Sequence, residues 1–224
     1  MLSQAEKGGV QNTIQNCVTV LQNDPILADS IRLNLLSERI DIVKPMSWQR
    51  SGPTLTDTDM MYILRRMEKY GLYSEKRVSA AIRIVANENH YHPIRDYLND
   101  LKWDGTARIS RALHRFLGAA KDELTTEALK IFLLGAIKRV FHPGCKFEMM
   151  FCLVGGQGAG KSSFFRLLAI KDEWFSDDLR RLDDDNVFRK LQGHWIMEMS
   201  EMIATANAKS IEEIKSFLSK QKET

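Results

Sequence analysis

The sequence predicts an α/β protein in which a mostly helical N-terminal region is followed by a partial P-loop nucleotide-binding domain. Three observations predict this class. Short amphipathic helical segments follow one another over the first half of the chain. The apolar run at 147–154 (FEMMFCLV) has the length and composition of a buried strand. A glycine-rich loop follows this run directly and opens a further helix, so strand passes to helix through a turn of the kind that binds phosphate.

The composition is that of an ordinary globular protein. With 224 residues, 44% hydrophobic and 27% charged, the chain suffices for one large domain or two small ones, and a disordered or fibrous class is excluded. The longest apolar stretch, 128–141, is interrupted by three basic residues, so no membrane helix is expected. Three widely spaced cysteines do not support a disulfide framework or a zinc site and favour reduced thiols in the cytoplasm.

In the first part of the chain we expect a flexible leader over 1–15 and a helical region over 16–120 that is a candidate for DNA binding. The segment 12–21 fits a helix or a strand. Asp24 and Pro25 then have the pattern that caps and starts a helix, and 44–53 is a loop. Thr56 or Asp57 caps a helix that ends near Gly71. A further helix is expected over 74–89 and a short one from Pro93 to residue 101.

The second part of the chain begins with longer periodic segments. A turn at 102–105 precedes a helix over 107–117, and a strongly apolar helix covers 124–141. His142-Pro143-Gly144 ends that helix, and the predicted strand follows. We place the P-loop domain at 121–224.

The residues that carry chemistry are in the run GGQGAGKS, which fits G-x-x-x-x-G-K-[ST]. The glycines let the backbone direct N–H groups at phosphate oxygens, and the helix N-terminus adds partial positive charge. Lys161 would reach the β- and γ-phosphates of ATP, and the Ser162 hydroxyl would ligate Mg²⁺. The alternative is a glycine-rich turn with a surface lysine. The nucleotide-binding candidates are Gly155, Gly156, Gln157, Gly158, Ala159, Gly160, Lys161, Ser162 and Ser163.

A P-loop enzyme also needs an acidic residue at the end of a second strand. The segment 194–201 (HWIMEMSE) supplies Glu198 and Glu201 as catalytic candidates. Because they are three apart, a regular strand points them to opposite faces. Glu201 lies nearer the expected strand end and is the preferred acid. For each, the alternative is a solvated carboxylate at a strand end.

Charge along the chain suggests where DNA would bind. The net charge of +3 is too small to indicate a nucleic-acid partner, but 61–100 carries +2 and 101–150 carries +4. Arg111 and Arg115 are four apart and share one face of a predicted helix. A basic tail with Lys215 is as well explained by a solvated helix face.

The chain resembles the virulence-associated protein E family, phage and genomic-island proteins related to superfamily 3 helicases. The resemblance rests on three stretches, His92–Ile109, Lys138–Ala169 and Leu191–Met202. It implies an AAA+-like ATPase that acts with ATP and Mg²⁺ in replication of a mobile element's DNA, in the cytoplasm of a bacterial host, and that forms homo-oligomeric rings when full-length. It also implies that Glu201 is a second nucleotide-binding acid and that Lys215 lies in a segment associated with DNA contact.

In this family, further sequence supplies a sensor strand and an arginine that reaches a neighbour's nucleotide. Neither is seen before Thr224, so we expect a C-terminally truncated and weakly active ATPase. The alternative function is a non-catalytic DNA- or protein-binding regulatory module that interferes with replication. A small-molecule kinase is disfavoured because the sequence shows no substrate lid.

Overall fold

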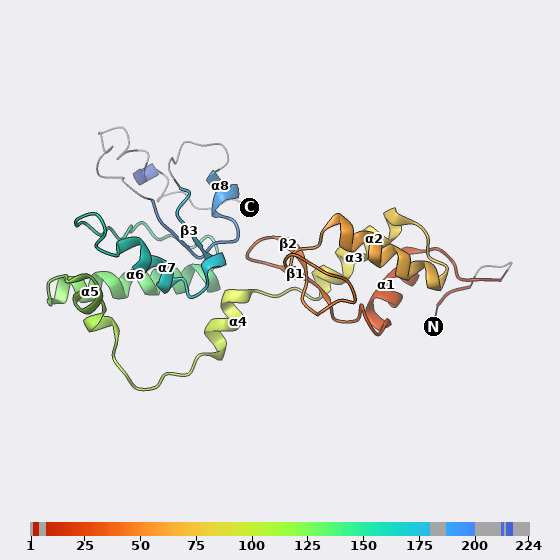
Figure 1. The fold of residues 1–224 in the computed structure, drawn as a ribbon, viewed down its shortest axis with the longest axis horizontal. Helices are drawn as coiled ribbons and strands as arrows, with labels where there is room; N and C mark the ends of the chain where they lie inside the picture. The colour runs from red at the N-terminus through yellow and green to blue at the C-terminus, as the bar shows by residue number, and fades with distance from the viewer. Residues whose placement is uncertain (1, 5–7, 180–186, 200–211, 213, 217–224) are drawn as a thin grey trace. The chain divides into compact units, whose positions relative to one another are not determined.

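A computed structural model describes residues 2–4, 8–179, 187–199, 212 and 214–216, and its ribbon is drawn in Figure 1. The chain divides into two compact units, residues 1–93 and 94–224. The helices over 93–117, which the sequence analysis assigned to the N-terminal region, therefore belong almost entirely to the second unit. Helices and two small two-stranded sheets make the protein a mixed α/β structure, which agrees with the predicted class at this level.

The first unit begins with helix α1, Ile14–Asn23, which settles the open choice at 12–21 in favour of a helix. Thr13 caps it, because its hydroxyl accepts a hydrogen bond from the Asn16 amide. The predicted helix after Asp24 is wrong: residues 25–30 form turns. Asp24 does accept hydrogen bonds from the amides of Ile26 and Leu27, as a cap would, but its carboxylate also binds Arg66 and Tyr70 from another helix. These tertiary contacts hold a turn where the local sequence favours a helix.

A β-hairpin follows that the sequence analysis did not predict. Strand β1, Ile31–Asn34, pairs antiparallel with β2, Arg39–Ile42. Asn34 binds the amides of Leu36 and Ser37 through its side chain, and Glu38 takes a positive φ of 54°, so the turn is closed without a glycine. The usual Asn-Gly or Asp-Gly signal of a hairpin is therefore missing from the sequence.

The first of the next two helices starts at a cap that the sequence predicted. Helix α2, Asp57–Met67, starts at a capping box made by Thr56 and Asp59, and a 3₁₀ turn, Glu68–Tyr70, extends it. Gly71 ends it with φ of 75°, in the left-handed region that glycine adopts without strain. Helix α3, Glu75–Glu88, then follows the cap residue Ser74.

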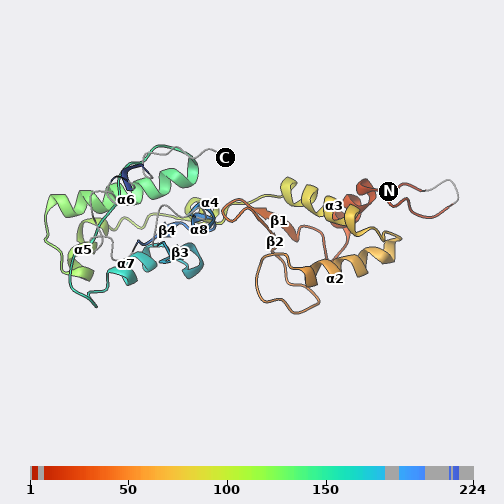
Figure 2. The same ribbon diagram turned by 90° about the horizontal axis from the view of Figure 1, so that it is seen from above.

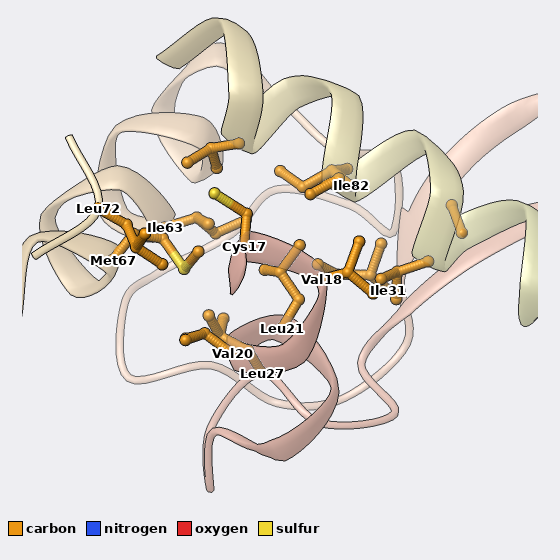
Figure 3. Close-up of a cluster of buried hydrophobic side chains, with 14 of the residues drawn as sticks. Cys17, Val18, Val20, Leu21, Leu27, Ile31, Ile63, Met67, Leu72 and Ile82 are labelled. Carbon is orange, nitrogen blue, oxygen red and sulfur yellow. The ribbon is translucent and has the colours of Figure 1, made fainter. Parts of the chain in front are cut away.

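The core of the first unit lies between α1, α2, α3 and the hairpin (Figure 3). Its side chains come from every one of these elements, and most are less than 5% exposed. Burial of each large aliphatic side chain stabilises the fold by about 1.5–3 kcal/mol. The buried members shown in Figure 3 are Cys17, Val18, Val20, Leu21, Leu27, Ile31, Ile63, Met67, Leu72 and Ile82.

The second unit starts with three helices close to their predicted positions: α4, Pro93–Asp100, α5, Ile109–Leu117, and α6, Glu123–Phe141. Asp122 caps α6 by accepting a hydrogen bond from the Thr125 amide. Gly118 ends α5 with φ of 67°. Helix α5 packs against α6. Among the described residues, no helix has both the length and the apolarity that a membrane span requires.

The predicted buried strand at 147–154 is not formed. The segment is extended, and Phe147, Phe151 and Leu153 are partly buried while the residues between them are exposed. No strand within the described ranges pairs with it. Its backbone therefore lacks the ladder of hydrogen bonds that defines a strand. The apolar composition favoured a strand, but pairing depends on a neighbouring strand.

The remaining described elements follow this segment. They are α7, Lys161–Leu168; a 3₁₀ turn, Asp172–Trp174; β3, Phe175–Ser176; α8, Val187–Leu191; and β4, Ile196–Met197. Strands β3 and β4 pair in parallel, and α7 contacts both; Figure 2 shows the three elements together from above. A short parallel pair joined through a helix is the arrangement of an α/β unit.

Candidate functional site

The loop Gly155–Gly160 lies at the surface between the extended segment and α7. Gly158 and Gly160 have φ of 78° and 80°, so each needs the left-handed conformation that only glycine adopts readily. Gly160 is the residue that precedes the first turn of α7. The backbone thus turns sharply into the helix, and Lys161 and Ser162 occupy its first two positions. The motif residues predicted from the sequence are therefore brought to one helix N-terminus.

An aromatic cluster holds the segment before this loop and the helix after it. Phe151 of the incoming segment stacks on Phe132 of α6 with ring centroids 5.4 Å apart. Phe165 of α7 meets both rings edge to face, at 5.8 Å and 5.9 Å. Phe164, the next residue on the same helix, is buried with Leu113 and Leu129 of α5 and α6. The segments before and after the loop are thereby held against one helix pair.

The Lys161 ammonium contacts the loop itself. Its Nζ atom donates hydrogen bonds to the carbonyl oxygens of Gly155, at 2.9 Å, and Gly156, at 2.8 Å. The side chain therefore curls over the loop and places a positive charge beside the loop backbone. An arriving anion would meet this charge together with the N-terminus of α7.

The Ser162 hydroxyl donates a hydrogen bond of 2.6 Å to Oε1 of Glu198, which lies 36 residues further along the chain. Glu198 follows directly after β4, and its amide donates to the Ser176 carbonyl of β3 at 2.8 Å. The parallel pair β3–β4 therefore delivers a carboxylate to the second residue of the loop helix. A hydroxyl and a carboxylate at this distance form a donor set of hard oxygens, as Mg²⁺ prefers.

Three aromatic side chains anchor β4 so that Glu198 reaches this position. The indole N–H of Trp195 donates to the Ala136 carbonyl of α6 at 3.2 Å. Trp174 meets Trp195 edge to face at 6.3 Å, and Tyr97 of α4 meets Trp174 at 5.7 Å. Because Trp195 is only three residues before Glu198, its contact with α6 also sets the position of the carboxylate.

Of the two predicted acids, the structure brings Glu198 to the loop, while Glu201 lies outside the described residues. Glu201 was preferred because the strand was expected to continue to it, but β4 ends at Met197. The sequence signal for Glu198 is that it is the first acid after the apolar pair Ile196-Met197. Within the described parts of the chain, no group of three His, Cys, Asp or Glu side chains is placed to hold a metal ion.

The three candidate DNA-contacting residues come from two parts of the chain, α5 and the segment that contains Lys215. Arg111 and Arg115 are exposed on α5; the Arg111 guanidinium donates to the Ala107 carbonyl at 3.2 Å, and that of Arg115 lies over the Phe116 ring at 5.6 Å. Lys215 is exposed and forms an ion pair of 2.9 Å with Glu212, so its charge is locally balanced. Arg111 and Arg115 thus remain available to an anion, and Lys215 less so.

Two shallow hollows lie in the first unit. One, of about 320 Å³, is lined by Arg39 and Arg83 above an apolar floor that includes Ile82. The other, of about 400 Å³, is lined by the ion pair of Arg50 and Asp59. Neither includes a residue of the loop motif.

Comparison with known proteins gives one family. The model of the virulence-associated protein E-like domain matches residues 98–224, which includes α5, α6, the glycine-rich loop and β4. A search of curated proteins finds no match.

Proposed function

Since the chain belongs to the virulence-associated protein E-like family, matched over residues 98–224, we propose that it binds Mg-ATP at Gly155–Ser162 and hydrolyses it in the DNA replication of a phage or other mobile element. Family membership supports the association with mobile elements. The nucleotide chemistry is argued from the site, and the DNA association from the charges on α5.

The observation that carries the ATPase proposal is the 2.6 Å hydrogen bond between Ser162 and Glu198. P-loop NTPases hold Mg²⁺ between the hydroxyl of the motif and an acid at the end of a neighbouring strand. A glycine-rich turn with only a surface lysine does not require such an acid. Here both groups are present, they come from distant parts of the chain, and they already touch.

Each remaining residue of the site has a part in binding. The loop glycines allow the backbone N–H groups to face phosphate oxygens, and the N-terminus of α7 adds partial positive charge. Lys161 would exchange its two carbonyl contacts for phosphate oxygens, which bind an ammonium more strongly because they are charged. Ser162 and Glu198 would hold Mg²⁺, which neutralises charge that develops on the phosphates during transfer.

The proposal is tested by calorimetric titration with ATP, with Mg²⁺ and with EDTA. Lys161→Ala removes a charge-assisted contact and should weaken ATP binding about 10- to 100-fold. Lys121→Ala, an exposed lysine between α5 and α6, is the matched control and should bind as the wild type does. Ser162→Ala and Glu198→Gln should lose most of the gain in affinity that Mg²⁺ provides.

Equal affinity of the Lys161→Ala variant and the wild type would refute nucleotide binding at this loop. If Lys161→Ala weakens binding while Glu198→Gln keeps the full effect of Mg²⁺, the loop binds ATP but Glu198 is not the acid that holds the metal.

A further inference from the structure

The most exposed tryptophan of the protein lies in the segment between α4 and α5. The Trp103 side chain is 81% exposed, and each residue from 101 to 111 is exposed. The three other tryptophans are buried or partly buried. In Figure 1 this segment runs apart from the helices of its own unit. A large aromatic surface left in water is unfavourable, and it indicates a binding role when charged groups surround it.

The backbone next to Trp103 is held in a defined shape. Asp104 binds the Arg108 guanidinium through both carboxylate oxygens, at 2.9 Å and 2.6 Å, and accepts a hydrogen bond from the Thr106 amide at 3.0 Å. Gly105 between them has φ of 81° and makes the turn. Because this ring of contacts closes directly after Trp103, the indole is attached to an ordered turn, which lowers the entropy cost of binding through it.

Positive charge follows the tryptophan along the chain. Lys102 precedes it, and Arg108, Arg111 and Arg115 come after it at intervals that place them on one face of α5. The carboxylate of Asp104 is the only acid over 101–117, and it is paired with Arg108. A second exposed aromatic ring, Phe116, is 66% exposed and lies beneath Arg115.

We propose that Trp103 stacks on a base of single-stranded DNA while Arg111 and Arg115 hold phosphates further along the same strand. This rests on the DNA association proposed above and specifies the strandedness and the contact. Proteins bind single strands without sequence preference by combining aromatic platforms with cations that follow the backbone. In a duplex the base faces are covered by their neighbours, so the indole has no partner there, whereas the arginines contact phosphates of either form.

The test uses the full chain with oligo(dT) and with duplex DNA of the same length, without nucleotide. Binding of oligo(dT) should quench tryptophan fluorescence, and Trp103→Phe should lose most of this quench but keep most of the affinity, because phenylalanine also stacks. Trp103→Ala should weaken binding of oligo(dT) roughly tenfold or more and leave binding of the duplex unchanged. Tyr73→Ala, a 68% exposed aromatic residue of the first unit, is the control and should change neither.

The charge reversal Arg111→Glu with Arg115→Glu separates the stacking contact from the DNA association. It should weaken both DNA forms and reduce the dependence of affinity on salt. If the reversal acts as expected but Trp103→Ala binds oligo(dT) like the wild type, the stacking inference is wrong and the DNA association stands. If neither form binds at low salt, or the reversal has no effect, both are wrong.

Discussion

At the scale of single residues, Asp59 joins the start of α2 to the loop before it. Its carboxylate is buried and accepts hydrogen bonds from Trp48, at 2.7 Å, and from Arg50, at 2.8 Å and 3.2 Å. It also accepts from the Thr56 amide in the capping box. Burial raises the pKa of the Asp59 carboxyl, but these hydrogen bonds outweigh burial and hold the pKa well below its usual range. Asp59 is therefore ionised whenever the unit is folded near neutral pH.

The low pKa predicts how stability depends on pH. The folded state binds its proton at lower pH than the unfolded chain, whose carboxyl has a pKa near 3.9. The stabilisation is therefore complete above about pH 5 and is lost as the pH falls toward the folded pKa. Asp59→Ala should lower the free energy of unfolding by about 3–5 kcal/mol at pH 7, because it removes the capping box and leaves the partly buried Arg50 without its charged partner. Guanidinium titrations should show this difference shrinking from pH 5 to pH 2. A difference independent of pH would contradict it.

At the scale of elements, a close contact between Gly135 of α6 and Phe147 holds the segment that leads into the glycine-rich loop. Gly135 is buried on α6, and the Phe147 ring lies where a Cβ on residue 135 would be, at 2.2–2.6 Å from the ideal position. Arg139, one turn further on, donates to the Phe147 carbonyl at 3.1 Å. The absence of a side chain at residue 135 therefore lets the extended segment pack directly on the helix.

This contact predicts that the effect of Gly135→Ala on the free energy of unfolding changes sign when Phe147 is replaced by alanine. Alanine normally stabilises a helix interior by about 1 kcal/mol relative to glycine. Gly135→Ala should nevertheless destabilise the wild type by about 1–3 kcal/mol, because the added methyl group displaces the Phe147 ring. In the Phe147→Ala background the same substitution should be neutral or stabilising. The measurement is thermal unfolding of the wild type, the two single variants and the double variant. If Gly135→Ala destabilises the protein in both backgrounds, the close approach is disproved.

At the scale of the whole molecule, the chain forms two compact units with separate cores. The core of the first unit draws only on residues before 93, from Cys17 to Ala86. The cluster under the glycine-rich loop draws only on residues after 93, such as Leu113, Leu129 and Phe164. The backbone bridge between Asn34 and Tyr91 also closes the first unit on itself. Each of these two clusters is thus made by residues of a single unit.

A fragment of residues 1–93 should therefore fold alone. We expect it to unfold in one cooperative transition, with helical circular dichroism, because its core and its hairpin are complete within it. Asp59→Ala should cost the fragment about as much stability as it costs the full chain, which provides an internal control. A fragment that shows no cooperative transition would mean that the first unit depends on the second.

Local sequence determined most of the helices and the loop motif. Thr56 and Asp122 mark helix starts, and Gly71 and Gly118 mark helix ends, because caps and left-handed glycines act on the backbone next to them. The motif Gly155–Ser162 is likewise a local requirement, and Gly158 and Gly160 take the left-handed conformation that glycine adopts without strain. The sequence alone also indicated the family that the match over 98–224 shows.

Tertiary contacts decided what local patterns left open or indicated wrongly. Asp24 meets Arg66 and Tyr70 across the unit and holds a turn, where its neighbours favour a helix. The segment 147–154 has the apolar run of a buried strand but no described partner, and a strand exists only when a second one pairs with it. Glu198 reaches Ser162 because it follows β4 directly and Trp195, three residues earlier, is anchored on α6. Such choices depend on residues far away in the sequence, so no local pattern encodes them.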